Sequence, residues 1–591
     1  MWFRKMIVTV AKLAMKCLPQ KWVDILKDSP YLLAMYTKNI HHSGILYQLP
    51  TAAEAQKQYD QYLAFQEKRT QTDVTFNTDV NPLNIVICAD SLDEKLFRRT
   101  LESINDSRLY GNIIVWSRAE IASVLSDISN GFSELSIVIV SELKQTFLSS
   151  ELLNAPCFVV FSGDVIATSL ADSVATHVLK NTKVAYVDTD IVWLGHQQRT
   201  LPDFKPDWNP DLQLTNGYIR SGVWLNSLRY FANTAPELSA FCIVRFLCEQ
   251  YLNHSIKDVL HIPQILVSRP TAELSMNEGI AYLSDLLSEH SEIVDSKQAV
   301  FHLRWPLKNE PLVSLIIPTR NGKVLVEACI ESILSKTDYP HYEILLVDNN
   351  SDEAESLQYF EFLAKHPKIT VLKYPDEFNY SAINNFAVKH AKGSVIGLIN
   401  NDIEVISPYW LTDMLGHVLR DDIGCVGAKL LYESNRIQHA GVILGYGGGA
   451  GHAHKFFTST HAGYMNRLIA SHNFSAVTAA CLLVTKSDFE AVDGLNEQHL
   501  AIAFNDVDFC LKIQALGLRN LFCAEALLYH HESVSRGAED TVEKQLRFKR
   551  ELDYLQCNWA DVIKHDPAYN PNLTLVTENF VIKDYQKESK K

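Results

Sequence analysis

The sequence predicts an α/β protein with two tandem, mostly parallel sheets and a short helical segment before them. Short apolar runs typical of buried strands alternate with segments of helical spacing, which is the pattern of a parallel sheet covered by helices. The succession occurs twice: LESI at 101–104 matches IESI at 330–333, and FSGD at 161–164 matches INND at 399–402. The offset of roughly 230–260 residues is too long for a solenoid repeat and indicates a duplicated domain.

Composition limits the class of protein. Of the 591 residues, 47% are apolar and 21% are charged, which are ordinary globular values that exclude wholesale disorder. The formal net charge of −15 makes the surface as a whole a poor partner for nucleic acid. The 11 cysteines form no CxxC pair and no small disulfide framework, so we expect reduced thiols in a cytoplasmic protein.

The chain is predicted to consist of five parts. They are a helical N-terminal segment at 1–80, a first α/β module at 81–270, a linker at 271–310, a second α/β module at 311–565 and a tail at 566–591. The two modules follow from the repeat, and the linker is the stretch that joins its two copies.

The first forty residues combine basic and apolar side chains. Residues 1–40 hold seven Lys/Arg against two Asp, and Lys12 and Lys16 interrupt the apolar run. The run is shorter than the ~18 apolar residues of a spanning helix. One interpretation is an interfacial helix on an anionic membrane, at the inner face of the cytoplasmic membrane. The other is a helix that packs on the next domain.

Three predicted strands of the second module end in polar clusters. These clusters are PTRN at 318–321, DNN at 348–350 and NND at 400–402. Ligands bind at the carboxyl ends of the strands in open α/β sheets, so we expect the clusters to lie together. A carboxylate there can bind ribose or base hydroxyls, and another can hold Mg²⁺ or Mn²⁺ against phosphates. One such cluster alone is more often a turn or a helix cap, but three in register favour a site.

A later segment adds two carboxylates. In AFNDVDFCLKIQALG (503–517), Asp506 and Asp508 are two residues apart, so on a helix they point to different sides. Asp506 can therefore face a site while Asp508 supports it from behind. The alternative is that Asn505 or Asp506 caps the helix.

The next segment adds histidines and an arginine. In LLYHHESVSRG (527–537), His530, His531 and Arg536 follow another apolar run. Histidine can bind the same metal, and arginine can clamp phosphate. The alternative is a structural histidine with a surface arginine.

Taken together, these motifs resemble the inverting family 2 glycosyltransferases with a GT-A fold. The branch is that of the bacterial rhamnosyltransferase-like enzymes of O-antigen, capsule and other surface polysaccharide. The resemblance covers roughly residues 311–575 and is specific as a set, although each motif alone is weak. It is carried by VSLIIPTRNG (313–322), LLVDNNS (345–351), FNYSAINNFAVKHAKG (378–393), LINNDIEV (398–405), IQHAGVILG (437–445), TAACLLVTKSDFEAVDGLNE (478–497), AFNDVDFCLK (503–512), YHHESVSRG (529–537) and YNPNL (569–573).

The resemblance implies a GT-A organisation for both modules and a role for each matching residue. The implied contacts of the nucleotide sugar are Thr319, Arg320, Asp348, Asn400 and Arg536. The implied metal ligands are Asp402, His530 and His531, and the cofactor is Mg²⁺ or Mn²⁺. The implied catalytic base is Asp506.

The implied enzyme is a glycosyltransferase for hexosyl or deoxyhexosyl groups. Its donor would be a nucleotide-diphosphate sugar, and its acceptor a hydroxyl of a growing surface polysaccharide or lipid-linked oligosaccharide. The metal and Arg536 would neutralise the departing diphosphate. Asp506 would take the proton of the acceptor hydroxyl during direct displacement, which inverts the anomeric centre.

The stretch GYGGGAGHAHKF (445–456) is rich in glycine but lacks the GK[ST] ending of a P-loop. One interpretation is a mobile lid near the donor or acceptor, and the other is a flexible connection. We favour the lid because His452 and His454 follow the glycines, although the sequence assigns them no role.

The first module departs from the pattern of the second. VAYVDTDIV (184–192) and HIPQILVSR (261–269) resemble the N-terminal module of two-module members of the family, but Asp164 alone remains of a DXD motif. NIIVWS (112–117) lacks the nucleotide-binding aspartate, and no NDVD equivalent is visible between 220 and 260. We predict a GT-A-like module that no longer catalyses and that binds acceptor, self-associates or supports its neighbour. A second, divergent active site is the alternative.

Two other functions compete with the transferase. A catalytically silent glycan-binding or scaffold protein would not need Asp348, Asp402 and Asp506. A nucleotidyltransferase that makes activated sugars would need a glycine-rich nucleotide loop and a nearby lysine, which PTRNG at 318–322 does not supply.

Overall fold

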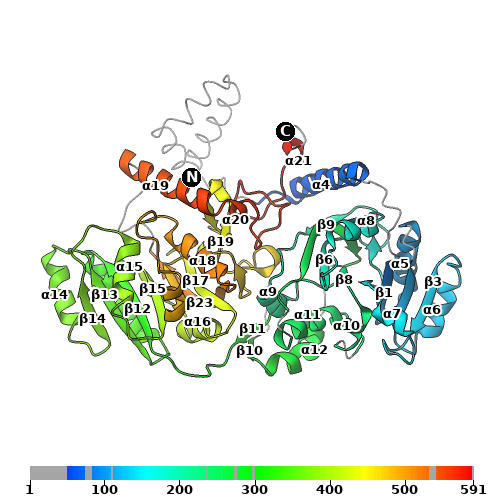
Figure 1. Cartoon of the computed structure of the whole chain (residues 1–591), viewed down its shortest axis with the longest axis horizontal. Coiled ribbons are helices and arrows are strands. Elements are labelled where there is room, and N and C mark those ends of the chain that lie inside the picture. Colours follow the sequence, from blue (N-terminus) through cyan, green and yellow to red (C-terminus); the bar gives the residue numbers. More distant parts are fainter. Residues whose placement is uncertain are drawn as a thin grey trace, which may run out of the picture. The chain divides into compact units, whose positions relative to one another are not determined.

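Figure 1 shows the computed structural model of the chain. The N-terminal unit comprises Pro50–Leu303, together with Pro567–Thr574 and the tail from Val581 onward. The C-terminal unit comprises Arg304–Asp566 and Leu575–Phe580. The structure describes residues 49–73, 83–107, 111–234, 237–254, 256–271, 276–295, 300–531 and 541–588. The predicted membrane-facing segment therefore lies outside the described residues.

The N-terminal unit contains a nine-stranded sheet in the order β3-β2-β1-β4-β8-β6-β9-β5, with β7 beside β6. Its strands are β1 (Asn84–Ala89), β2 (Asn112–Ser117), β3 (Ser136–Val140), β4 (Cys157–Phe161), β5 (Val165–Ile166), β6 (Val184–Ile191), β7 (Thr200–Asp203), β8 (Val223–Leu225) and β9 (Leu260–Arg269). Its helices are α4 (Ala52–Asp73), α5 (Glu94–Asp106), α6 (Ala122–Ser129), α7 (Ser150–Asn154), α8 (Leu170–His177), α9 (Pro210–Asn216), α10 (Leu228–Ala232), α11 (Cys242–Leu252), α12 (Met276–Ser288) and α21 (Tyr585–Glu588).

The C-terminal unit contains a ten-stranded sheet in the order β14-β13-β12-β15-β22-β17-β23-β16, with β18 beside β17 and β21 beside β23. Its strands are β12 (Val313–Thr319), β13 (Tyr342–Asp348), β14 (Ile369–Lys373), β15 (Val395–Ile399), β16 (Ile403–Val405), β17 (Ile423–Leu431), β18 (Ile437–His439), β21 (His472–Phe474), β22 (Cys481–Thr485) and β23 (Arg519–His530). A separate hairpin pairs β19 (Val442–Leu444) with β20 (Ala450–His452). The helices are α13 (Lys323–Lys336), α14 (Ala354–Leu363), α15 (Tyr380–Val388), α16 (Trp410–Val418), α17 (Lys486–Ala491), α18 (Asn505–Ala515), α19 (Val542–Asn558) and α20 (Ala560–Lys564), with short 3₁₀ turns at η3 (Tyr446–Gly448) and η4 (Tyr464–Asn466).

The two sheets have the same strand order. The strands β3, β2, β1, β4, β8, β6, β9 and β5 correspond in turn to β14, β13, β12, β15, β22, β17, β23 and β16. The directions also agree: the first four strands are parallel, and the strand after them is antiparallel in both units. The predicted fold class, α/β with two tandem and mostly parallel sheets, is therefore confirmed.

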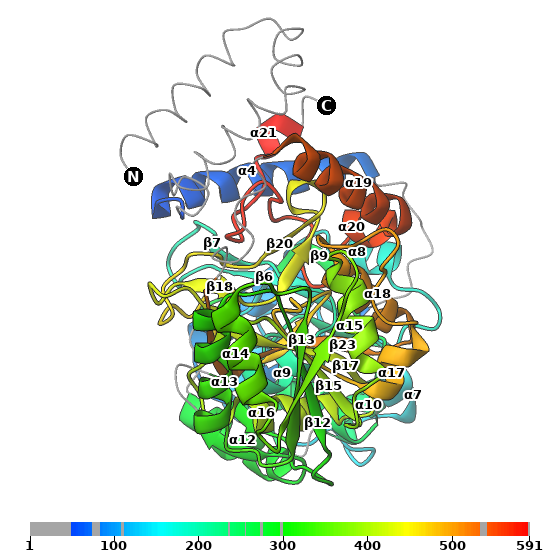
Figure 2. The same cartoon turned by 90° about the vertical axis from the view of Figure 1, so that its left-hand side faces the viewer.

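The apolar runs form strands because both faces of the central sheet are buried. All seven residues of β12 and all seven of β13 are buried. In β12, Leu315 and Ile317 join the core beneath α13, α14 and α16, whereas Ile316 joins the core beneath α15 and α18. Figure 2 shows these two groups of helices on opposite faces of the sheet. A strand that is covered on both sides needs apolar side chains at successive positions, which explains the continuous runs.

Helix positions also follow the predicted spacing. The helix expected at 324–337 is α13, in which Val326, Ile330 and Ile333 are fully buried and Leu334 packs against the same core. Within the predicted helical segment at 1–80, the structure describes α4. None of the described helices is long and apolar enough to cross a membrane.

The predicted linker, residues 271–310, contains regular structure where it is described. It forms α12 and a two-stranded sheet of β10 (Glu292–Asp295) and β11 (His302–Arg304). Up to Leu303, this stretch belongs to the N-terminal unit. On α12, Leu283, Leu286 and Leu287 are buried, and side chains spaced three and four apart in this way form one apolar helix face.

Candidate active site

A cavity of about 690 Å³ lies in the C-terminal unit at the carboxyl ends of its central parallel strands. It is lined by the ends of β12 and β15, the β19–β20 hairpin, residues 478–480, the start of α18 and the end of β23. Of the sequence-predicted site residues, the following six line it: Thr319, Arg320, Asn400, Asp402, Asp506 and His530.

The loop after β12 forms the first wall of the cavity. The Asn401 side-chain amide donates a hydrogen bond of 2.9 Å to Thr319 Oγ1, which ties the ends of β12 and β15 together. Arg320 is 59% exposed, and its Nη2 lies 3.8 Å from Asp352 Oδ2, so its guanidinium is available to a ligand. Asp348 does not line the cavity, and its Oδ1 accepts a 3.0 Å hydrogen bond from the backbone N–H of Ser351.

The pairing of β16 with β23 brings the predicted metal ligands together. Ile403 lies opposite His530 in this antiparallel pair, so the residue before it, Asp402, meets the end of β23. His530 Nε2 lies 3.3 Å from Asp402 Oδ1 and 3.2 Å from Asn400 Nδ2. The side chains of Asp402 and His530 are only 5% and 7% exposed.

This pair fits a divalent cation. The His530 nitrogen that faces the carboxylate is Nε2, and it carries a lone pair because it accepts a hydrogen bond from the Asn400 side-chain amide. A carboxylate oxygen and an imidazole nitrogen that face each other inside a cavity are suitable ligands for an ion such as Mn²⁺. The burial of both groups is costly in the absence of a compensating charge.

His531 is directed elsewhere. Its Nδ1 lies 2.8 Å from Glu433 Oε1 and its Nε2 lies 3.5 Å from Glu404 Oε2, and it does not line the cavity. Neighbouring residues on an extended chain point to opposite sides, so His530 and His531 cannot both face one ion easily. Arg536 lies outside the described residues.

The two carboxylates of α18 point apart. Asp506 lines the cavity, and its Oδ2 accepts a 3.2 Å hydrogen bond from the backbone N–H of Ala479. Asp508 is buried away from the cavity, where its Oδ1 accepts a 2.8 Å hydrogen bond from Trp559 Nε1. Phe504, just before the helix, has a left-handed backbone with φ of 58°. Such a conformation is unfavourable for a bulky residue, so the surrounding packing must hold it in place.

The glycine-rich stretch forms the β19–β20 hairpin, whose Ala450, Gly451 and His452 line the cavity. A Cβ atom on Gly449 would lie 2.6 Å from Leu552 Cδ1 of α19, so the absence of a side chain there permits close packing. The hairpin is therefore a wall of the cavity that packs against α19.

Sequence reasoning missed a histidine pair in that wall. The His439 and His452 rings meet edge to face with centroids 4.9 Å apart, and His452 Nδ1 lies 2.8 Å from the Gln438 carbonyl oxygen. Burial holds the pKa of His439 well below its usual value, and the nearby His452 and His530 lower it further, so the ring is neutral. The motifs IQH (437–439) and GHAH (451–454) contain these two histidines, but the contact between their rings depends on the fold of the hairpin.

Comparison with known proteins identifies the domain around this cavity. Residues 314–478 match the family model described as glycosyl transferase family 2. This segment is similar to glycosyl transferase family 2, in agreement with the predicted glycosyltransferase. The matched segment includes the Thr319, Asn400 and Asp402 wall of the cavity.

Two curated relatives extend the match beyond the family 2 domain. The chain is 40% identical to the uncharacterized protein y4gI of Sinorhizobium fredii over 435 residues, or 68% of this chain and 46% of that protein. It is 31% identical to the O-antigen biosynthesis protein RfbC of Myxococcus xanthus over 480 residues, or 77% of this chain and 37% of that protein. The chain therefore spans less than half the length of both relatives.

Solved structures give a weaker similarity. One is the mannosyltransferase PcManGT from Pyrobaculum calidifontis in complex with GDP-Man and Mn²⁺, with 16% identity and a TM-score of 0.33. The match covers 45% of this chain and 68% of that chain.

The N-terminal unit holds different groups at the position equivalent to the family 2 cavity. Asp164 follows β4 as Asp402 follows β15, but it is fully buried and accepts hydrogen bonds from Ser221 Oγ and from the Phe161 N–H. Val165 of β5 lies opposite Ser268, whereas the corresponding Ile403 lies opposite His530. Burial raises the pKa of Asp164.

Proposed function

We propose that the C-terminal unit is an inverting glycosyltransferase that moves a sugar from a nucleotide-diphosphate donor to a hydroxyl of a growing surface polysaccharide or lipid-linked glycan. The observation that carries the proposal is that the Asp402–His530 pair and Asp506 line one cavity within a unit that contains a family 2 domain. The name of the Myxococcus relative supports a place in O-antigen synthesis.

Two groups of residues in the cavity have different proposed roles. Asp402 and His530 would hold a Mg²⁺ or Mn²⁺ ion, which supplies positive charge for the diphosphate leaving group when it is bound. Thr319, Arg320 and Asn400 would position the nucleotide and the diphosphate. Asp348 and His531 do not line the cavity and Arg536 lies outside the described residues, so the proposed roles of these three rest on the resemblance.

Asp506 is the proposed general base. Its carboxylate stands at the cavity surface, and the Ala479 N–H fixes one of its oxygens, so it can accept the proton of an acceptor hydroxyl as that oxygen attacks. The attack takes place opposite the leaving group and needs no covalent enzyme intermediate. His452 lines the same cavity and can contact either sugar.

We propose that the N-terminal unit supports this reaction without catalysing one. Its Asp164 carboxylate is already engaged by Ser221 and by backbone, and a serine replaces the histidine of the pair. A buried carboxylate with these partners is stabilised as a structural group and is poorly placed to receive an ion.

The test compares equivalent aspartates in the two units. The full chain is incubated with Mn²⁺ or Mg²⁺, a panel of sugar nucleotides and lipid-linked or oligosaccharide acceptors, and the release of nucleoside diphosphate and pyrophosphate is measured. We expect metal-dependent diphosphate release that Asp402→Asn abolishes and Asp164→Asn preserves. The opposite pattern would move catalysis to the N-terminal unit. Pyrophosphate release would indicate a nucleotidyltransferase, and donor binding without any release would indicate a glycan-binding scaffold.

A further inference from the structure

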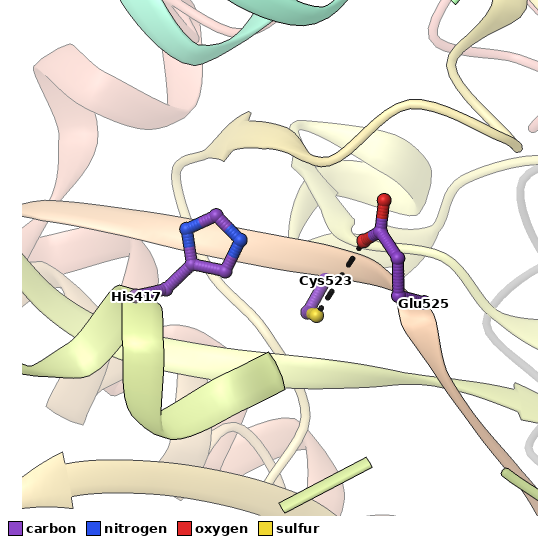
Figure 3. A group of neighbouring side chains, drawn as sticks. All are labelled: His417, Cys523 and Glu525. Carbon is purple, nitrogen blue, oxygen red and sulfur yellow. Dashed lines mark hydrogen bonds between the residues drawn. The ribbon is translucent and has the colours of Figure 1, made fainter. Parts of the chain in front are cut away.

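A second cluster of metal-ligand side chains lies in the C-terminal unit, away from the cavity. His417 lies in the last turn of α16, and Cys523 and Glu525 lie in the middle of β23. One ligand atom from each residue lies within 4.8 Å of the other two. Figure 3 shows the imidazole, the thiol and the carboxylate turned toward one another. None of the three residues lines the cavity.

The local fold explains this convergence. Cys523 and Glu525 are two residues apart on β23, and Figure 3 shows their side chains next to each other. The pairing of β23 with β17 is irregular here: Ala428 lies opposite Cys523, but the next residue of β17 lies opposite Leu527. Residues 524–526 therefore leave the ladder. Ser471 Oγ donates a hydrogen bond to the Glu525 carboxylate and accepts one from the Ala524 N–H. Helix α16 packs on β23 and supplies the third group.

The spacing fits a tetrahedral ion. Cys523 Sγ lies 3.7 Å from Glu525 Oε2. With Zn–S near ~2.3 Å and Zn–O near ~2.1 Å, a tetrahedral angle places sulfur and oxygen about 3.6 Å apart. The same distance also suits a weak S–H···O hydrogen bond, so the spacing permits either a thiol or a metal thiolate.

Two charged side chains near the cluster have partners of their own. Asp413 is occupied by Arg304, at 2.7 Å. The buried ammonium of Lys429 donates to the Leu468 carbonyl oxygen at 2.7 Å and also interacts electrostatically with the Glu525 carboxylate. A coordinated cysteine loses its proton, so a bound divalent ion would lie beside two negative charges, the Cys523 thiolate and the Glu525 carboxylate.

One contact opposes metal binding. Arg420 Nη1 donates a 3.2 Å hydrogen bond to His417 Nδ1, so in this arrangement the ring proton lies on Nε2, which faces Cys523. A metal on Nε2 requires the ring proton on Nδ1, and the guanidinium must then turn away. Asp422 Oδ1 already lies 3.8 Å from Arg420 Nε, so the guanidinium can turn toward a carboxylate that it would share with Arg519.

We propose that His417, Cys523 and Glu525 form a structural Zn²⁺ site that fastens α16 to β23. Mixed nitrogen, sulfur and oxygen donors suit zinc better than magnesium or calcium, and water would complete the coordination. On binding, the thiol releases its proton to solvent, the imidazole proton moves from Nε2 to Nδ1, and no redox change occurs. Cys523 precedes His530 by seven residues on β23, a separation of roughly 20 Å, so this ion is distinct from the one proposed at Asp402.

Cobalt substitution tests the thiolate bond directly. The full-length chain is purified, stripped with a chelator and titrated with Co²⁺ and then with Zn²⁺, while absorption and bound metal are measured. To remove the other proposed ion, Asp402→Asn is the background for every variant. We expect about one tightly bound Zn²⁺ per chain and a sulfur-to-cobalt charge-transfer band in the near ultraviolet.

Four variants complete the test, with circular dichroism as the control for folding. Cys523→Ser should remove the band, and both it and His417→Gln should weaken Zn²⁺ binding by at least about tenfold. Cys557→Ser, at the exposed cysteine, should change neither. Arg420→Gln should tighten binding, because it removes the donor that opposes the metal-bound ring. Co²⁺ binding without a band, or equal binding by the Cys523 and Cys557 variants, would overturn the proposal whatever the outcome for glycosyl transfer.

Discussion

The two units share one strand order but place different side chains at the ends of equivalent strands. At the end of the fourth parallel strand, the C-terminal unit places Asp402 beside His530 in an open cavity. At the equivalent point of the N-terminal unit, Asp164 is buried and accepts a hydrogen bond from Ser221 Oγ. The difference shows that a conserved backbone topology does not preserve a site, because the chemistry depends on a few side chains at the strand ends.

A second equivalent region differs in the same way. Both units have an irregular register between their last two long strands, β6 with β9 and β17 with β23. In the N-terminal unit this region holds a buried network: Asp188 Oδ1 lies 2.9 Å from His261 Nε2, and Asp207 Oδ1 lies 3.0 Å from His261 Nδ1. In the C-terminal unit it holds Cys523 and Glu525. The same irregularity of the ladder therefore accommodates different buried polar side chains in the two units.

The largest expected effect separates the two carboxylates of α18. Asp506→Asn should lower kcat by about 10²–10⁴-fold, because a general base is lost, with little change in melting temperature. Asp508→Asn should keep most of the activity and instead lower the melting temperature, because the Trp559 indole then donates to a neutral amide oxygen. Steady-state diphosphate release and thermal unfolding measure the two effects. A large loss of kcat in the Asp508 variant alone would break the assignment.

The next effect concerns pH and the N-terminal unit. Burial alone would lower the pKa of His261, but Asp188 and Asp207 outweigh it and raise the pKa to about 9. The stabilisation is therefore complete below the unfolded pKa of about 6.5 and is lost as pH rises through about 9, a total of about 3 kcal/mol. Denaturant unfolding of the N-terminal unit between pH 6 and 10 measures it. His261→Gln should be less stable at pH 6 and should show a flatter pH profile, and an unchanged profile would contradict the charged ring.

A smaller effect is expected at the C-terminal tail. The Asn570 side-chain amide donates to Asp188 Oδ2 at 2.9 Å and to the Lys205 carbonyl oxygen at 2.8 Å. Asn570→Ala should destabilise the N-terminal unit by about 1–3 kcal/mol, because two buried acceptors lose their donor. We expect kcat to stay within about twofold of the parent enzyme. Limited proteolysis of the tail, compared with Asn558→Ala as an exposed control, checks the first expectation.

The smallest effect on stability is expected at Arg320. Its ion pair with Asp352 is exposed and 3.8 Å long, so Arg320→Gln should change the free energy of unfolding by less than about 1 kcal/mol. The same variant should raise KM for the donor, because a cation that can bind phosphate is lost. Binding of nucleoside diphosphate by calorimetry, with Lys323→Gln as the matched control, measures the change. Unchanged donor affinity would remove Arg320 from the site.

The sequence predicted most of the architecture because its signals are local. Buried parallel strands require continuous apolar runs. The duplication in the sequence is enough to place Asp164 and Asp402 at equivalent strand ends. Asp506 could be separated from Asp508 because helix geometry alone fixes their relative directions.

Other features depend on contacts between distant segments. The His439–His452 pair forms only through the β19–β20 hairpin, and the His417–Cys523 approach depends on how α16 packs on β23. The pattern HH at 530–531 suggested two ligands, but the extended backbone sends His531 to Glu433. These contacts are set by tertiary packing, which cannot be read from the spacing of residues along the chain.

The pairing of β16 with β23 also affects how the protein is made. Asp402 and His530 are separated by almost 130 residues, so a growing chain does not contain both until its last long strand has left the ribosome. The N-terminal unit is complete later still, because its Asp188 carboxylate accepts a hydrogen bond from Asn570, which is translated after the whole of β23. At the usual 5–20 residues per second, translation of the stretch from Asp188 to Asn570 takes about 20–80 s, so the first unit emerges long before it can mature. We therefore expect nascent chains arrested before the tail to be sensitive to proteases in the N-terminal unit.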